Sequence, residues 1–111
     1  MSTEPQLSVV VPVYNEQDNV APLVNEITSA LRGVLPFEIV YVDDLSTDNT
    51  LATLQRLRTE VPELRVVRHL RNSGQSTAIR NGVKAARAPW IATLDGDGQN
   101  DPADAPKLLT L

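Results

Sequence analysis

The chain has 111 residues, 41% of them hydrophobic, which suits one globular domain and excludes a disordered chain. A formal net charge of −4 argues against a nucleic-acid binder, and the absence of cysteine excludes disulfides, thiolate metal sites and cysteine nucleophiles. No apolar run approaches the roughly 18 residues of a membrane span and the N-terminus lacks a signal-peptide pattern, so we expect a soluble, cytoplasmic segment.

Four short apolar runs alternate with segments of helical spacing. The runs at 7–13, 37–42, 64–70 and 90–94 predict buried strands because they are rich in valine, isoleucine and aromatic residues. We expect His69 to be an ordinary residue of the third strand and Trp90 to lie in the core.

The helical segments each have a buried stripe and a stop signal. The stripe of the first helix runs from Val20 to Leu31, and Gly33 follows as a stop signal. The second helix is expected to be capped by Asp48 and to end before Pro62. The third stripe consists of Ala78, Ile79, Gly82, Val83 and Ala86, whose small members allow close packing. A further helix is expected to begin near Ala105, after a turn marked by Pro102 and Pro106.

This alternation predicts an α/β fold. Short connections between strands and helices imply a mostly parallel, open, doubly wound sheet with right-handed crossovers and helices on both faces, in three layers. The last amphipathic segment stops as it begins, so we expect the N-terminal part of a longer protein. Exposed sheet edges make a homodimer plausible.

Polar clusters follow all four predicted strands, and in a parallel sheet they meet at one edge. The clusters are Tyr14-Asn15-Glu16, Asp43-Asp44, Arg71-Asn72-Ser73-Gly74 and Asp95-Gly96-Asp97. Two carboxylates about 5 Å apart repel by roughly 3 kcal/mol at an effective dielectric near 20. The crowded carboxylates therefore predict a bound divalent cation at this edge.

The spacing of Asp95, Asp97 and Gln99 points three oxygen ligands to one side of an extended segment, as Mg²⁺ or Mn²⁺ prefers. An acidic turn capped by Asp101 is the alternative. The segment does not match a calcium loop of the EF-hand type, which requires glycine at its sixth position and glutamate at its twelfth, because these positions are Asn100 and Pro106.

Other residues at this edge also allow two interpretations. Asp43 and Asp44 are suited to accept hydrogen bonds from a base edge or a ribose, whereas Ser46 and Asp48 suit a turn and a helix cap. Tyr14 either packs at the strand end or offers a face for a base. Gly74 and Gly82 are expected to supply a tight turn and close helix packing.

The motifs together resemble the family-2 inverting glycosyltransferases over nearly the whole chain. They are Pro12-Val13-Tyr14-Asn15-Glu16, Val42-Asp43-Asp44-x-Ser46-x-Asp48-x-Thr50, Asn72-x-Gly74 with Ala78 and Gly82, and Asp95-x-Asp97. The run from Leu94 to Pro102 is similar to the branch that transfers sugars to polyprenyl or dolichol phosphate. Leu45 departs from the usual glycine and Gly98 from the leucine common in this branch.

The resemblance implies a GT-A fold in which residues 1–111 bind a UDP- or GDP-sugar and the acceptor-binding half lies outside them. Tyr14 would stack near the base, Asp44 would contact its edge and Asp43 would lie close to the nucleoside. Asp95 would approach the ribose or the metal, and Asp97 and Gln99 would bind a Mg²⁺ or Mn²⁺ that bridges the diphosphate. Pro12, Glu16, Asn72 and Gly74 would complete the nucleotide-sugar site.

The implied reaction is sugar transfer with inversion to a polyprenyl phosphate, with the whole protein at the cytoplasmic face of the membrane. Any catalytic base is implied to lie downstream of Asp97, so these residues are expected to bind donor and metal but to be inactive alone. The alternative function is a non-catalytic, Mg²⁺-binding domain of the receiver type.

Overall fold

One parallel sheet and three helices make up residues 4–95, the part of the chain that the computed structural model describes. The strands are β1 (Leu7–Val13), β2 (Phe37–Asp43), β3 (Leu64–Arg68) and β4 (Trp90–Thr93), and they lie in the order β3-β2-β1-β4. The helices are α1 (Gln17–Leu31), α2 (Thr50–Glu60) and α3 (Gln75–Ala85). The helix predicted near Ala105 lies outside the described residues.

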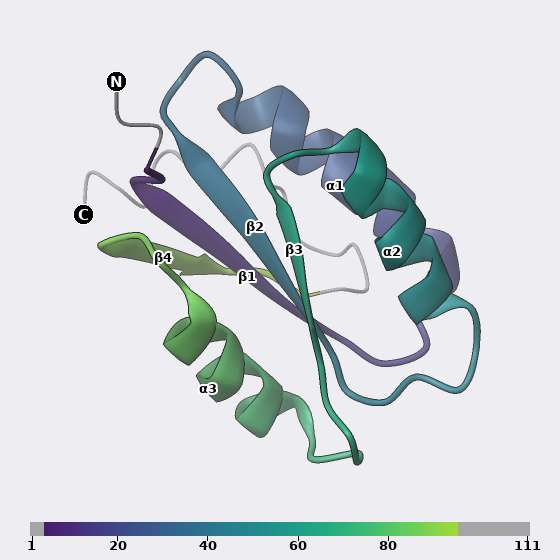
Figure 1. The fold of residues 1–111 in the computed structure, drawn as a ribbon. Coiled ribbons are helices and arrows are strands. Elements are labelled where there is room, and N and C mark those ends of the chain that lie inside the picture. Colours follow the sequence, from purple (N-terminus) through teal and green to yellow (C-terminus); the bar gives the residue numbers. More distant parts are fainter. Residues whose placement is uncertain (1–3, 96–111) are drawn as a thin grey trace.

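The helices cover both faces of the sheet (Figure 1). Helices α1 and α2 pack together on one face, and α3 lies on the other. The chain moves outward from β1 to β3 along one side, and then α3 carries it back to place β4 beside β1. The predicted doubly wound, three-layer α/β fold is confirmed, and the strand order reverses between β1 and β4.

Alternation along β1 and β2 builds two cores. Leu7, Val9, Val11 and Val13 face α1 and α2 in the larger cluster, together with Ile39 and Tyr41 of β2. Val10, Val40 and Val42 face α3, where Ala78 completes a smaller cluster. Both faces of the central strands are therefore buried, as their continuous apolar runs predict.

The smaller core depends on a glycine. A Cβ at Gly82 would collide with a methyl group of Val10 and stand 3.0 Å from Cγ2 of Val42, so α3 lies against the sheet only because this side chain is missing. The predicted role of Gly82 in close packing is confirmed.

Gly82→Ala is expected to lower the free energy of unfolding by about 1–2 kcal/mol. The overpacking cost of about 1–3 kcal/mol exceeds the gain in helix propensity of about 1 kcal/mol. Chemical denaturation measures the change, with Ser76→Ala on the exposed part of α3 as control. A variant as stable as the wild type would contradict the tight contact.

Three expectations about individual residues are wrong. Strand β3 ends at Arg68, because the following segment leaves the sheet and Leu70 is 90% exposed. Trp90 is 53% exposed and not in the core, because β4 is an edge strand of the described sheet. The buried stripe of α3 is narrower than predicted: only Ala78 and Gly82 are buried.

A buried glutamate ties the connection between α3 and β4 to the amino end of the sheet. Glu38 is 2% exposed and accepts hydrogen bonds from Oγ of Ser8 (2.5 Å), Nη1 of Arg65 (2.8 Å) and the backbone N–H of Arg87 (2.7 Å). The same Nη1 of Arg65 also donates to the carbonyl oxygen of Ala85, the last residue of α3. Burial raises the pKa of Glu38, but these hydrogen bonds outweigh it and hold the pKa below the ordinary value of 4.5.

Candidate functional site

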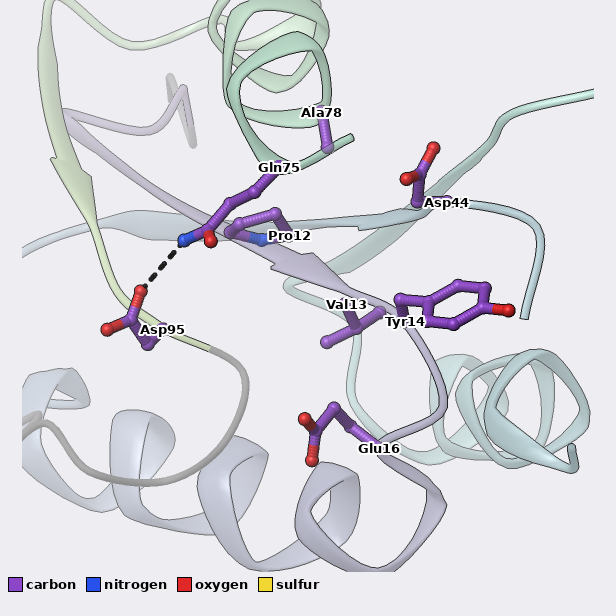
Figure 2. Close-up of a pocket in the computed structure, with 8 residues that line it drawn as sticks. All are labelled: Pro12, Val13, Tyr14, Glu16, Asp44, Gln75, Ala78 and Asp95. Carbon is purple, nitrogen blue, oxygen red and sulfur yellow. Dashed lines mark hydrogen bonds between the residues drawn. The ribbon is translucent and has the colours of Figure 1, made fainter. Parts of the chain in front are cut away.

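A cavity of about 270 Å³ opens at the carboxyl ends of β1, β2 and β4, next to the first turn of α3 (Figure 2). It is lined by Pro12, Val13, Tyr14, Glu16, Asp44, Gln75, Ala78 and Asp95. The cavity lies where the strand order reverses, between β1 and β4, which is the usual ligand position in open α/β sheets.

The structure gathers many of the predicted site residues around this cavity. Those that line it are Pro12, Tyr14, Glu16, Asp44 and Asp95. Asn72 and Gly74 lie behind the lining and donate hydrogen bonds to Asp44, whereas the side chain of Asp43 bonds to Ser46, which does not line the cavity. Asp97 and Gln99 lie outside the described residues. Sequence reasoning did not identify Val13, Gln75 or Ala78 as lining residues, although the position of Gln75 at the start of the third helix was an available signal.

Tyr14 and Glu16 are positioned by a clamp between two loops. The backbone N–H of Asn15 donates to Oγ of Ser46 (2.9 Å), and Oδ1 of Asn15 accepts from the N–H of Thr47 (2.8 Å). The N–H of Glu16 donates to Oγ1 of Thr50 (2.9 Å), at the start of α2. Tyr14 is 46% exposed, so its side chain is not packed into the core and is accessible to a ligand.

Leu45 occupies a backbone conformation that glycine adopts more readily. Its φ of 61° and the φ of 54° at Asn15 place both residues in the left-handed region, on the two loops that the clamp joins. Leu45 therefore adopts the left-handed conformation expected of a glycine at this position, at a conformational cost of order 1 kcal/mol.

Asp43 is fully buried and serves the turn after β2. Its Oδ1 accepts the hydroxyl of Ser46 (2.5 Å), while Oδ1 of Asp48 accepts the N–H of Thr50 (2.9 Å) at the start of α2. The predicted turn at Ser46 is confirmed. The predicted cap at Asp48 is wrong by one residue, because Asn49 is the N-cap residue of α2 and Asp48, just before it, accepts the N–H of Thr50.

Asp44 is held by three donors from outside β2. Its Oδ1 accepts from Nδ1 of His69 and from the N–H of Ser73, and its Oδ2 accepts from the N–H of Gly74, each at 2.8 Å. Nδ2 of Asn72 donates to the carbonyl oxygen of Asp44 (3.1 Å). Burial raises the pKa of Asp44, but the hydrogen bonds outweigh it and lower the pKa below its ordinary value.

The hydrogen bonds to Asp43 and Asp44 correct the expectation that repulsion between adjacent carboxylates requires a bound partner. We expected the adjacent acids to need a bound partner, but for Asp43 and Asp44 the fold itself supplies the hydrogen-bond donors. His69 is also misassigned by the sequence, since it follows β3 and bonds to Asp44, and its Nε2 lies 2.9 Å from Nδ2 of Asn81. A polar residue at the carboxyl end of a strand was the signal for this role.

Asp95 follows β4 and reaches the cavity from the side opposite Asp44 (Figure 2). Its Oδ1 accepts a hydrogen bond from Nε2 of Gln75 (3.1 Å). Residues 4–95 contain no cluster of three acidic, histidine or cysteine side chains able to hold a metal ion. The metal site predicted at Asp95, Asp97 and Gln99 therefore stays a prediction. In the same range, no helix has the length and apolar character needed to cross a bilayer.

Several curated proteins are similar to nearly all of this chain. Over 107 residues it is 42% identical to a dodecaprenyl-phosphate galacturonate synthase from Rhizobium johnstonii, a match covering 95% of the chain and 32% of that protein. It is 38% identical over 104 residues to a dolichol-phosphate mannosyltransferase from Pyrococcus furiosus, covering 94% and 29%. It is 41% identical over 110 residues to an undecaprenyl-phosphate 4-deoxy-4-formamido-L-arabinose transferase from Yersinia enterocolitica, covering 96% and 33%. The chain spans about a third of the length of these relatives.

Solved structures confirm the predicted GT-A fold. Residues 1–349 of TarS from S. aureus in complex with UDP-GlcNAc superpose with a TM-score of 0.76 at 27% identity, over 95% of this chain and 30% of that one. The mannosyltransferase PcManGT from Pyrobaculum calidifontis, in complex with GDP-Man and Mn²⁺, gives a TM-score of 0.81 at 24% identity, over 96% and 32%. The model of the family described as Glycosyl transferase family 2 matches residues 8–111. With the fold, the cavity and these similarities in agreement, the chain belongs to glycosyltransferase family 2.

Proposed function

We propose that the whole protein transfers a sugar from a nucleoside-diphosphate sugar to a polyprenyl phosphate, and that the cavity at the carboxyl end of the sheet is part of its donor site. The observation that carries the proposal is this cavity, where an exposed aromatic ring and three carboxylates from separate elements meet. The family and the names of the relatives support the reaction class.

Four lining residues and three residues behind them have roles in the proposed donor binding. The accessible side chain of Tyr14 stacks on the base, and Asp44 accepts an N–H from the edge of the base. Pro12 and Glu16 shape the same cavity, while Asn72 and Gly74 act through their hydrogen bonds to Asp44. Asp43 supports the turn on which Asp44 is presented.

A divalent metal fits the donor set, because the carboxylate of Asp95 reaches the cavity and oxygen is the ligand atom that Mg²⁺ and Mn²⁺ prefer. Asp95, Asp97 and Gln99 would hold it. When bound, such an ion neutralises the charge that develops on the leaving diphosphate.

The reaction exchanges one bond at the anomeric carbon for another. A phosphate oxygen of the acceptor forms the new bond from the face opposite the donor, the bond to the nucleoside diphosphate breaks, and the configuration inverts. An ionised phosphate carries its own negative charge and needs no general base. Residues 1–111 hold the leaving nucleoside diphosphate, and the acceptor binds to the rest of the protein, so these residues by themselves do not catalyse transfer.

The test is isothermal titration calorimetry of the 111-residue chain with UDP and GDP, with and without Mn²⁺. We expect Tyr14→Ala to weaken nucleotide binding about tenfold, since stacking of one base contributes roughly 1–3 kcal/mol. Val34→Ala is the matched control, because Val34 is an exposed apolar residue in the connection between α1 and β2 and does not line the cavity. Absence of binding of either nucleotide in the presence of Mn²⁺ would contradict the proposal.

A further inference from the structure

Three side chains from three elements form a continuous hydrogen-bonded chain that ends in the cavity. Asp44 follows β2, His69 follows β3 and Asn81 lies on α3. The carboxylate of Asp44 lies 2.8 Å from Nδ1 of His69, and Nε2 of His69 lies 2.9 Å from Nδ2 of Asn81. Of these three residues, only Asp44 lines the cavity.

The order of donors along this chain defines the tautomer of His69. A carboxylate only accepts hydrogen bonds, so Nδ1 of His69 carries the proton that it donates to Asp44. Nε2 is then the acceptor of the neutral ring and receives the amide N–H of Asn81. Asn81 therefore acts on Asp44 indirectly, by keeping the proton of the imidazole on the nitrogen that faces the carboxylate.

The same hydrogen bonds limit what Asp44 still accepts. The two oxygens of a carboxylate offer about four acceptor positions. His69 and Ser73 occupy both positions on Oδ1, and Gly74 occupies one on Oδ2. One acceptor position, on Oδ2, is left for a ligand.

We propose that His69 and Asn81 are positioning residues that leave Asp44 with a single acceptor position, and that the cavity thereby prefers uridine diphosphate to guanosine diphosphate. This inference rests on the proposed function, in which Asp44 contacts the base. The edge of uracil presents one N–H, at N3, between two carbonyl groups. The edge of guanine presents N–H groups at N1 and N2 side by side, and these suit a carboxylate with both oxygens open.

A guanine base opposite Asp44 would keep one N–H without an acceptor, and a buried donor left unpaired costs about 1–3 kcal/mol. UDP is therefore expected to bind to the chain about tenfold or more tightly than GDP in the presence of Mn²⁺. The matched ligand control is the 5′-diphosphate of N3-methyluridine, which stacks like uridine but lacks the N–H, and it should lose as much affinity as GDP.

Two substitutions of His69 distinguish a role in positioning Asp44 from a role in the stability of the fold. His69→Asn keeps an amide N–H near the place of Nδ1, whereas His69→Gln moves the amide toward the place of Nε2 and removes the donor to Asp44. We expect His69→Gln to free an acceptor position on Oδ1 of Asp44 and so to reduce the preference for UDP over GDP about tenfold, whereas His69→Asn should keep most of this preference, with similar midpoints of thermal unfolding. In the wild type, the ¹⁵N chemical shifts of the imidazole should report a neutral ring protonated at Nδ1, and Asn81→Ala should shift them toward the other tautomer.

The outcomes are distinguishable. UDP preference, its loss on N3-methylation and the difference between the two His69 variants would support the inference. Binding of GDP as tightly as UDP by the wild type, or an unchanged preference for UDP over GDP in His69→Gln, would overturn it and leave the donor-site proposal intact. If neither nucleotide binds to the wild type, the proposed function fails, and this inference fails with it.

Discussion

Glu38→Gln is expected to lower the free energy of unfolding by about 2–3 kcal/mol, although Glu38 lies at the end of the sheet opposite the cavity. The amide keeps the shape of the side chain but loses the charge that Arg65 and Arg87 pair with, and it directs an NH₂ group toward other donors. Because both arginines reach solvent, the loss is smaller than for a fully buried ion pair.

Equilibrium denaturation measures this effect, with Glu63→Gln as the matched control. Glu63 also pairs with an arginine, Arg32, but this pair is exposed and its loss should cost less than about 1 kcal/mol. If Glu38→Gln and Glu63→Gln lowered the free energy of unfolding equally, burial of Glu38 would not strengthen its contribution to stability, and the prediction would be wrong.

The contribution of Glu38 depends on pH in a defined direction. Its pKa is lower in the folded chain than the ordinary value of 4.5, so the unfolded chain binds the proton more readily. The stability that Glu38 contributes is therefore complete above about pH 4.5 and is lost as the pH falls through the folded pKa. Wild type and Glu38→Gln should accordingly differ most near neutral pH and converge in acid.

Asp44→Asn is expected to lower the free energy of unfolding by about 2–3 kcal/mol and to weaken nucleotide binding at least about tenfold. An asparagine has one acceptor oxygen where the carboxylate has two. If its oxygen keeps the hydrogen bonds from His69 and Ser73, its NH₂ group faces the N–H of Gly74 and removes the acceptor offered to a ligand.

Thermal unfolding and calorimetric titration together test this prediction, with Asp18→Asn in the exposed first turn of α1 as control. The control should bind nucleotide as the wild type does. An Asp44→Asn chain with unchanged stability and unchanged nucleotide affinity would contradict both the hydrogen-bond network and its link to the base.

Most of the fold followed from local patterns in the sequence. The valine-rich runs around Val10 and Val40 predicted buried strands because both of their faces are apolar, and the spacing from Val20 to Leu31 predicted α1. The errors fall at element ends, at the sheet edge and in the width of the buried stripe of α3. Trp90 has the composition of a core residue, but its burial depends on whether another element covers β4, which no local pattern records.

The sequence by itself determined the fold class and the place where polar side chains gather, because periodicity defines strands and helices, and the carboxyl ends of parallel strands share one edge. Only the tertiary structure decided which of these side chains face the cavity and which serve the fold. Asp43 and Asp44 are neighbours with the same chemistry, yet one is fully buried in a turn with Ser46 and the other lines the cavity. Successive residues of a strand point to opposite faces. Asp43 bonds to Ser46, three residues away, whereas the donors to Asp44, His69 and Gly74, come from segments distant in sequence.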